Sequence, residues 1–372
     1  MAGSSFGSHF QITTWGESHG KALGVVIDGC PAGLSLCEDD IQTFLNRRKP
    51  GQSKYSTPRR EADQIEILSG IFEGKTTGTP ISMLIYNTNQ RSSDYGKIAS
   101  VYRPGHADLT YDLKYGFRDY RGGGRSSGRE TIGRVAAGAV AVKLLSALGI
   151  SFCTYTLSIG DIQIDPARFS EQEIQNNALY MPDADAAEKA AALITACMQE
   201  KNSVGGIVEC KIFNCPAGLG EPCFDKLDAS FAKALMSIGA VKAVEIGDGT
   251  LASKATGRTN NDQMHAEDGQ LIKNSNHAGG IYGGISDGST ITLRAHIKPT
   301  PSISASQTTV TTDGNTTDIA IGGRHDPVIV PRAVVVVESM AALTVADALL
   351  TNMGSQVAHL KQIYCPKNHF GN

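Results

Sequence analysis

The sequence is poor in the features that mark nucleic-acid-binding proteins. Aromatic residues make up 6% of its 372 residues, and 34 Lys and Arg stand against 37 Asp and Glu, which gives a net charge of −3. A weakly acidic chain with few aromatic rings lacks the positive field and the stacking surfaces on which nucleic acids bind. We therefore expect no nucleic-acid partner, and any basic site must be local.

Signals for export or for a membrane are also missing. The first twenty residues contain no charged segment followed by an apolar run, so they do not match a signal peptide. The most apolar late stretch, 328–350, is interrupted by Arg332, Glu338 and Asp347, which does not fit a membrane span. The sequence predicts a cytoplasmic protein that has no membrane partner.

The cysteines do not indicate a metal site or a disulfide framework. The eight cysteines include no C-x-x-C pair, and no histidine pair has the spacing of a zinc site. Reduced cysteines without a metal are typical of a cytosolic chain. We expect free thiols and no bound metal.

The apolar periodicity predicts a mixture of helices and strands. The spacings Ser35-x-x-Glu38 and Ser127-x-x-Glu130 match capping boxes, so helices are predicted from these points to about residues 48 and 148. Further helices are predicted at about 183–200 and 224–238, and β-branched runs predict strands at 23–27, 65–68, 81–85, 204–213, 241–246 and 290–297. Because the two do not alternate one for one, we predict an α+β fold with largely antiparallel sheets. The Ser- and Thr-rich stretch 302–323 is predicted to be a surface loop.

One short segment occurs twice. Cys30-Pro-Ala-Gly-Leu34 recurs as Cys215-Pro-Ala-Gly-Leu219, about half a chain later, each time after a strand-like run and before a predicted helix. Internal duplication is one interpretation. Chance is the other, because Pro-x-Gly is common turn chemistry. No linker rich in Pro, Ser or charge separates the halves, so residues 1–372 are predicted to form one domain.

Three short motifs imitate known sites, but the residues around them do not support those sites. Gly16-Glu-Ser18-His-Gly20 fits the nucleophile elbow of a serine hydrolase, yet a strand-like run follows where a helix is needed. The Gly123–Gly128 spacing lacks the Lys of a phosphate-binding P-loop, and Gly247-x-Gly249 precedes no helical pattern that could hold a pyrophosphate. A hydrolase that uses Ser18 stays open as an alternative, and so does a non-enzymatic anion- or flavin-binding protein.

Positive charge is concentrated in two segments. Residues 47–60 carry six Lys and Arg and no acid, and residues 103–134 place six Arg and His106 among glycines and serines at a predicted helix start. Guanidinium forks and helix N-terminal amides bind phosphate and carboxylate groups. A solvated basic face is the alternative, but such clustering in a weakly acidic chain favours a small polyanionic ligand.

Five longer motifs follow one another along nearly the whole chain: Gly16-Glu-Ser-His-Gly20, Arg103-Pro-Gly-His-Ala-Asp108, Tyr120-Arg-Gly-Gly-Gly-Arg-Ser-Ser127, Ser275-Asn-His-Ala-Gly-Gly280 and Gly323-Arg-His-Asp-Pro327. In type and order they resemble the chorismate synthase family. The resemblance implies a lyase of the shikimate pathway that makes chorismate by anti 1,4-elimination of phosphate from 5-enolpyruvylshikimate 3-phosphate. It also implies reduced FMN as a cofactor without net redox change, a layered β-α-α-β sandwich and a homotetramer.

The resemblance assigns roles to individual residues. His19 is expected to protonate the departing phosphate, His106 the reduced flavin, and Asp326 is expected to move the proton of flavin N5. The residues expected to hold the substrate are Arg48, Arg103, Arg129 and Arg332. NADPH contacts fall on Arg48 and Lys54, where many members have Arg in place of Lys54.

The expected FMN contacts are Arg125, Ser126, Ser127, Gly239, Ala240, Gly283, Lys298, Pro299, Thr300, Pro301, Ser302 and Arg324. The resemblance covers nearly all of the chain, which leaves no room for a reductase domain. The flavin is therefore expected to receive electrons from an external flavin reductase, with NADPH as the indirect source.

Overall fold

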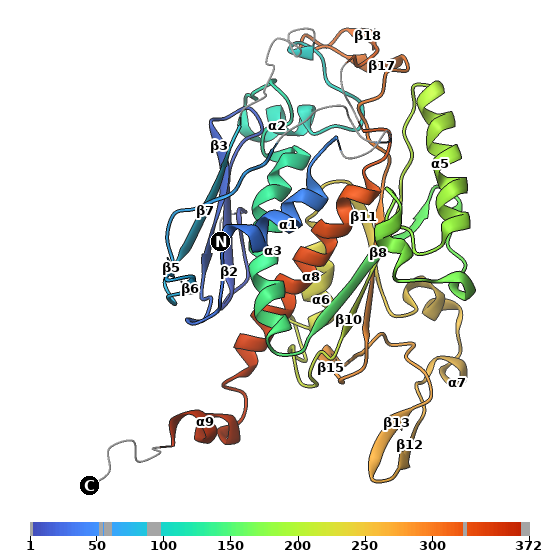
Figure 1. The fold of residues 1–372 in the computed structure, drawn as a ribbon. Coiled ribbons are helices and arrows are strands. Elements are labelled where there is room, and N and C mark those ends of the chain that lie inside the picture. Colours follow the sequence, from blue (N-terminus) through green and yellow to red (C-terminus); the bar gives the residue numbers. More distant parts are fainter. Residues whose placement is uncertain (1–2, 52–54, 56–61, 88–97, 323–325, 366–372) are drawn as a thin grey trace.

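The structure is a computed structural model that describes residues 3–51, 55, 62–87, 98–322 and 326–365 (Figure 1). Two five-stranded sheets, in which all neighbouring strands run antiparallel, form its frame. The first sheet has the order β1 (Ser5–Phe6), β2 (Gln11–Gly16), β3 (Ala22–Asp28), β7 (Ile81–Tyr86) and β4 (Glu66–Ile67). The second has the order β11 (Val241–Ile246), β16 (Ile291–Ile297), β10 (Gly206–Phe213), β8 (Ser151–Ile159) and β9 (Ile162–Gln163).

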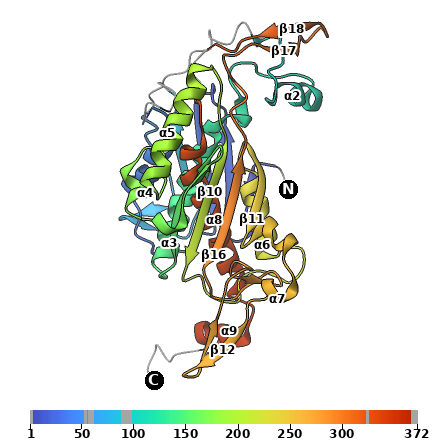
Figure 2. The same ribbon diagram turned by 90° about the vertical axis from the view of Figure 1, so that its right-hand side faces the viewer.

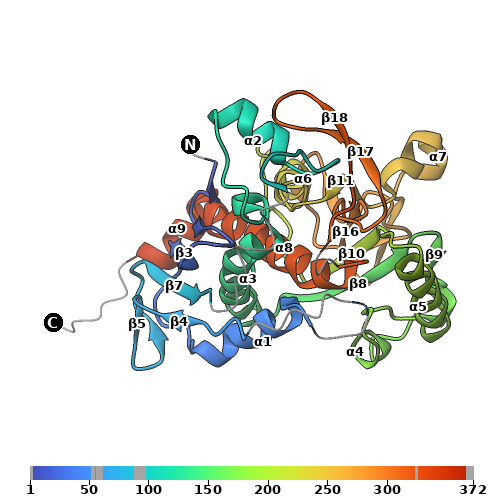
Figure 3. The same ribbon diagram turned by 90° about the horizontal axis from the view of Figure 1, so that it is seen from above.

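Three helices, α1 (Glu38–Arg48), α3 (Thr131–Ser146) and α8 (Val330–Asn352), lie between the two sheets (Figures 1 and 3). Helix α3 packs on β3 of the first sheet, α8 packs on β8 and β10 of the second, and α3 and α8 pack on each other. Helix α1 contacts both, and α6 (Leu227–Met236) packs on α8 and β11. Close approach of the central helices requires Gly138, because a Cβ there would lie 2.2 Å from the Cβ of Ser339.

The three charged residues of the apolar stretch 328–350 all have partners in the molecule. Arg332 lies at the candidate site, and the carboxylate of Glu338 accepts two hydrogen bonds from Arg47 at 2.9 and 2.8 Å. Asp347 accepts from three successive backbone N–H groups, those of residues 8–10. By length and composition α8 could cross a membrane, but 78% of its most apolar window is buried inside the molecule, as in a core helix.

The two halves share a strand order and a turn. Strands β2, β3, β7 and β4 follow one another in the first sheet, as β8, β10, β16 and β11 do in the second. In each half one hydroxyl group donates to the Pro carbonyl of the repeated segment and accepts from its Leu N–H. Thr76 does so at 2.7 and 2.9 Å, and Ser286 at 2.6 and 2.9 Å.

The mixed content of helices and antiparallel sheets is confirmed. The helix predicted at 183–200 is α5 (Ala184–Gln199), and the one predicted at 224–238 is α6. The capping box at Ser35 is wrong: Ser35 pairs with Lys75 in a β-bridge, so α1 begins two residues late, with Cys37 as its cap. Ser127 does cap a helix, a short 3-10 turn over Gly128–Glu130 that leads into α3.

The loop prediction for 302–323 is also wrong. This segment contains a hairpin of β17 (Gln307–Val310) and β18 (Thr316–Ile319), because β-branched Thr residues suit strands and Gly314, with φ +82°, makes the turn. The remaining elements are α2 (Asp108–Tyr115), α4 (Glu173–Asn176), α7 (Gly257–Asn260), α9 (Val357–Tyr364), β5 (Ile71–Phe72), β6 (Lys75–Thr76), β12 (Met264–Glu267), β13 (Gln270–Lys273), β14 (Ile281–Tyr282) and β15 (Ile285–Ser286). Helix α9 and the β12–β13 hairpin project from one end of the molecule (Figure 2).

Candidate active site

A cavity of about 520 Å³ opens between segments of the two halves. Its walls come from the β2–β3 turn, the segment before α2, the start of α3, the turn after α6, the segment after β16 and the start of α8. These segments carry most of the residues that the sequence marked. Those lining the cavity are His19, Arg103, His106, Arg125, Ser126, Ser127, Arg129, Gly239, Ala240, Lys298, Thr300, Pro301, Ser302, Asp326 and Arg332.

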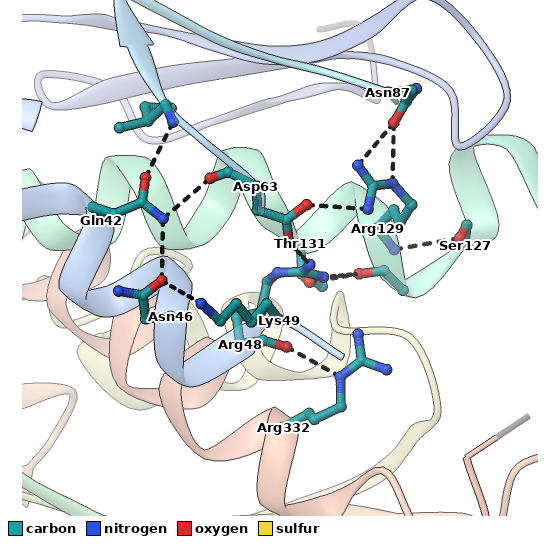
Figure 4. A network of polar contacts seen from close by, with 12 residues as sticks. Gln42, Asn46, Arg48, Lys49, Asp63, Asn87, Ser127, Arg129, Thr131 and Arg332 are labelled. Atoms are coloured by element: carbon teal, nitrogen blue, oxygen red, sulfur yellow. Dashed lines mark hydrogen bonds and ion pairs between the residues drawn. The ribbon is translucent and has the colours of Figure 1, made fainter. Parts of the chain in front are cut away.

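A buried carboxylate joins two of the arginines (Figure 4). Asp63 Oδ2 pairs with Arg48, and Asp63 Oδ1 accepts from Arg129 at 3.2 Å. Arg129 also donates to Asn87 Oδ1 at 3.1 and 2.8 Å. Asp63 has a φ of +46°, a strained value for a residue with a side chain, and Gln42 of α1 donates to its carbonyl at 3.2 Å. The network fixes the arginines before any ligand arrives.

Arg48 is 1% exposed and lies behind the cavity wall. Burial lowers the pKa of its guanidinium, Asp63 opposes this effect, and the nearby Arg332 cation lowers the pKa further. Arg332 donates from Nε to the carbonyl of Arg48 at 3.0 Å and pairs with Asp326 through its other end. Among the described residues, three cations and two carboxylates meet here, and this excess of positive charge attracts anions.

Each of the two histidines that line the cavity, His19 and His106, contacts a defined partner. His19 is 8% exposed, and its Nδ1 lies 3.2 Å from Ser18 Oγ. His106 Nδ1 lies 3.0 Å from Asp108 Oδ1. Burial opposes the charge of Asp108, but hydrogen bonds from Arg103 and His106 outweigh burial and hold the pKa of this carboxyl well below its usual value.

The cavity wall formed by the turn after α6 and the segment after β16 has features of a binding surface. Thr300 lines the cavity, and its buried hydroxyl has no hydrogen-bond partner among the described residues. Ala240 has a φ of +74°, a strained conformation that persists mostly at functional positions. Lys298 donates to the carbonyl of Gly105 at 2.8 Å, which ties this wall to the segment that carries His106. Cations and a hydroxyl group of this kind suit the binding of a phosphate group.

Some expected contacts lie elsewhere. Gly283 forms the turn between β14 and β15, before the start of β16, whereas Lys298 follows the end of that strand. Seven residues of strand span about 20 Å, so the structure does not bring Gly283 to the cavity. Pro299 lies within the lining segment without lining the cavity itself. Lys54 and Arg324 are outside the described residues.

Sequence reasoning missed Asp63, Asp108 and Gly122 as parts of the site. Asp108 ends a motif that was recognised, so its position was a usable signal. Asp63 carried no local signal. The segment 16–20 is a turn between antiparallel β2 and β3, which is not the strand-to-helix turn of a nucleophile elbow.

The chain is similar to known proteins over nearly its whole length. The family model described as chorismate synthase matches residues 10–350. The chain is 65% identical over 364 residues to the chorismate synthase of Agathobacter rectalis, which covers 98% of this chain and 99% of the relative. It is 56% identical to that of Methanosarcina barkeri, over 94% and 97% of the two chains.

A solved structure described as a chorismate synthase crystal structure is similar at a TM-score of 0.75. The two chains are 32% identical, and the similarity covers 96% of each. A family model over most of the chain, relatives of more than 50% identity over nearly its full length and a matching fold all agree. The chain therefore belongs to the chorismate synthase family.

Proposed function

We propose that this lyase of the shikimate pathway converts 5-enolpyruvylshikimate 3-phosphate into chorismate by anti 1,4-elimination of phosphate. The observation that carries the proposal is the gathering of His19, His106 and the arginine cluster at one cavity. A substrate with one phosphate and two carboxylates needs permanent cations that keep their charge when buried, and arginine supplies them. Arg103, Arg129 and Arg332 line the cavity, and Arg48 supports them from behind.

Reduced FMN is the proposed cofactor, and its fit rests on the Thr300 and Lys298 wall. When bound, it supplies transient electron density that helps the phosphate to leave without net redox change. Lys298, Arg125 and the hydroxyl groups of Ser126, Ser127 and Thr300 would hold it. The remaining chemistry falls to protein groups that hold or move protons.

The histidines and one carboxylate are assigned to those protons. An imidazole can hold or release a proton near neutral pH. His19 donates to the departing phosphate oxygen, and His106, when both of its ring nitrogens are protonated, donates toward the flavin through Nε2. Asp326, which pairs with Arg332 and lines the same cavity, would help to move the proton of flavin N5.

The stereochemistry gives a direct test. Substrate deuterated on either face of the ring carbon that loses its proton is incubated anaerobically with the protein and reduced FMN. Deuterium should be lost only from the face opposite the phosphate, and phosphate and chorismate should form in equal amounts. Loss from both faces, or phosphate without chorismate, would contradict the proposal.

The source of electrons is proposed to lie outside the chain. Purified protein with oxidised FMN and NADPH in air should be nearly inactive, and dithionite or a separate flavin reductase under anaerobic conditions should restore activity. NADPH is then an indirect reductant, and contacts at Arg48 and Lys54 would be weak. Rapid NADPH-driven bleaching of FMN by the protein alone would show a built-in reductase.

The finer architecture is also a proposal. The layering of the helices between the sheets and the shared Thr76 and Ser286 turns support a single-domain β-α-α-β sandwich that arose by duplication. Superposition of residues 11–146 on 151–352 should pair the strands in order. A cytoplasmic homotetramer is proposed from the family resemblance, and light scattering should give four times the 39.3 kDa chain mass. A monomer mass would rule the tetramer out.

A further inference from the structure

Asp108 connects more active-site groups than any role assigned so far requires. It is the first residue of α2 and is 5% exposed. Its Oδ1 accepts from Arg103 at 2.7 Å and from His106 Nδ1 at 3.0 Å, and it lies 3.1 Å from Arg118. Its Oδ2 accepts from the backbone N–H and the Nε of Arg103 at 3.0 and 2.8 Å. One carboxylate therefore holds both a substrate-binding arginine and a histidine.

The contact with His106 determines which nitrogen carries the proton. An ionised carboxylate can only accept hydrogen bonds, so Nδ1 of His106 must donate and carry the hydrogen. In the neutral imidazole the other nitrogen, Nε2, is then unprotonated and can take up a proton. His106 lines the cavity, so Nε2 is the atom through which it can exchange protons there.

The contact with Arg103 reaches the second histidine. The guanidinium of Arg103 also donates to the carbonyl of Gly122 at 3.0 Å. Gly122 lies against the ring of His19, since a Cβ built on it would be 2.5 Å from His19 Nδ1. Asp108, Arg103, Gly122 and His19 thus form one continuous set of contacts.

We propose that Asp108 is a positioning residue that fixes His106 with Nδ1 protonated and Nε2 open to the cavity, and that holds Arg103 at the substrate. The effect on turnover rests on the proposed function, whereas the tautomer of His106 does not. We expect loss of this partner to lower activity about 10- to 100-fold, a part of the roughly 10²- to 10⁴-fold that a general acid or base supplies. The effect through His106 should appear in kcat, and the effect through Arg103 should appear in KM.

The pH profile must be interpreted with all neighbouring charges in view. Among the described residues, the charged or titratable groups around Asp108 and His106 include Arg103, Arg118, Asp112, Tyr102 and Lys298, and His19 follows through Arg103 and Gly122. The arginines and Lys298 stay charged between pH 6 and 8, and Tyr102 stays neutral because burial raises its pKa above the usual value. Because His19 is joined to Asp108 through Arg103 and Gly122, a change in the profile of an Asp108 variant is assigned to the His106 and Asp108 pair only where it disappears when His106→Ala is already present.

A double-mutant cycle separates positioning from general damage. Asp108→Asn should lower kcat about 10- to 100-fold in the wild-type background and change the pH profile, but lower kcat less than about threefold when His106→Ala is already present. Its increase in KM should persist in both backgrounds. Asp165→Asn, which changes a half-exposed carboxylate paired with Arg168, is the matched control and should leave both constants unchanged. Equal losses of kcat in the two backgrounds would overturn the proposal.

Nitrogen NMR of wild-type protein with labelled histidines is a second test, and it does not depend on enzymatic activity. Neutral His106 should show hydrogen on Nδ1, and Asp108→Asn should populate the Nε2–H form. Hydrogen on Nε2 in the neutral wild-type protein would overturn the proposal even if Asp108→Asn fails to fold. Absence of phosphate release from the wild-type protein would instead defeat the proposed function and leave the tautomer to be decided by NMR.

Discussion

The backbone of Gly122 faces the imidazole of His19 with no room for a side chain. A Cβ at Gly122 would lie 2.5 Å from His19 Nδ1 and Cε1 and 3.0 Å from Ser18 Oγ, and its φ of +79° lies in the left-handed region. Glycine is required here because another residue would collide with the histidine. The positively charged segment 103–134 thus shapes the site through the backbone of its glycines as well as through its charges.

Gly122→Ala should displace His19 and lower kcat about 100-fold, the scale of lost general acid help. Gly124→Ala is the matched control, because Gly124 also has a positive φ, +50°, but a Cβ there meets nothing within 4 Å. Gly124→Ala should share the backbone strain of Gly122→Ala but lose far less activity. Steady-state kinetics with both variants decide the point, and equal losses would show that strain, not displacement of His19, causes the effect.

Arg48→Ala should mainly weaken substrate binding. The change removes a buried cation from beside Arg332 and leaves Asp63 with Arg129 as its partner. Charge-assisted hydrogen bonds contribute about 1.5–3 kcal/mol, so KM should rise about 10- to 100-fold and kcat should change less. Arg48→Lys keeps the charge but loses the forked guanidinium, so its KM should lie between those of the wild-type protein and Arg48→Ala. A lower Tm with an unchanged KM would make Arg48 purely structural.

Local motifs predicted the site better than the contacts that hold it. His106, Arg125, Ser126 and Ser127 lie in continuous motifs, so their chemistry could be read from neighbours in the sequence. Asp63 could not be found this way, because it meets Arg129 across 66 residues only after the chain has folded. Tertiary pairing brings such residues together, and a single sequence does not record it.

The accuracy of the secondary-structure predictions also depended on whether local sequence or long-range pairing decides the structure. The strand at 241–246 was predicted with its observed bounds, and the other predicted strands lie within two residues of the observed ones. The start of α1 was not, because the β-bridge between Ser35 and Lys75 competes with capping. Strand β8 was missed although seven of its nine residues are buried, because Thr154, Thr156 and Ser158 interrupt its apolar residues and leave no continuous apolar run.

In a reaction with an aromatic disulfide reagent, the exposed cysteine thiols should react rapidly and the buried ones should not. Burial raises the pKa of Cys30 and Cys153 to about 11 and that of Cys215 to about 12, so almost no reactive thiolate forms at pH 8. Native protein should react rapidly at the exposed cysteines, which are Cys37, Cys223 and Cys365. Unfolded protein should react at all eight without added reductant. Fewer than eight would reveal a disulfide.

Asp183 should make the fold more stable at neutral than at acid pH. Hydrogen bonds from Arg168 and from backbone N–H groups hold the pKa of this buried carboxyl, the cap of α5, well below its usual value although burial opposes them. A carboxyl whose pKa is lower in the folded state stabilises the fold above about pH 4, and this contribution is lost as pH falls.

Asp183→Asn keeps the cap and removes the charge, so it should lower the free energy of unfolding by about 1 kcal/mol at pH 7 and by less at pH 3. Urea unfolding at both pH values measures the difference, with the exposed Asp161→Asn as the control that should be neutral at both. A loss of the same size at pH 3 and pH 7 would contradict a role for the charge.

The most direct test of the central claim is the amount of phosphate released from 5-enolpyruvylshikimate 3-phosphate for each FMN reduced. Purified protein, substrate and a small amount of dithionite-reduced FMN are mixed without oxygen, and phosphate and flavin absorbance are followed together. We predict many phosphates per flavin, with the flavin still reduced at the end, and no release when FMN is left oxidised. One phosphate per flavin with matching flavin oxidation, or release without reduced flavin, would contradict the account.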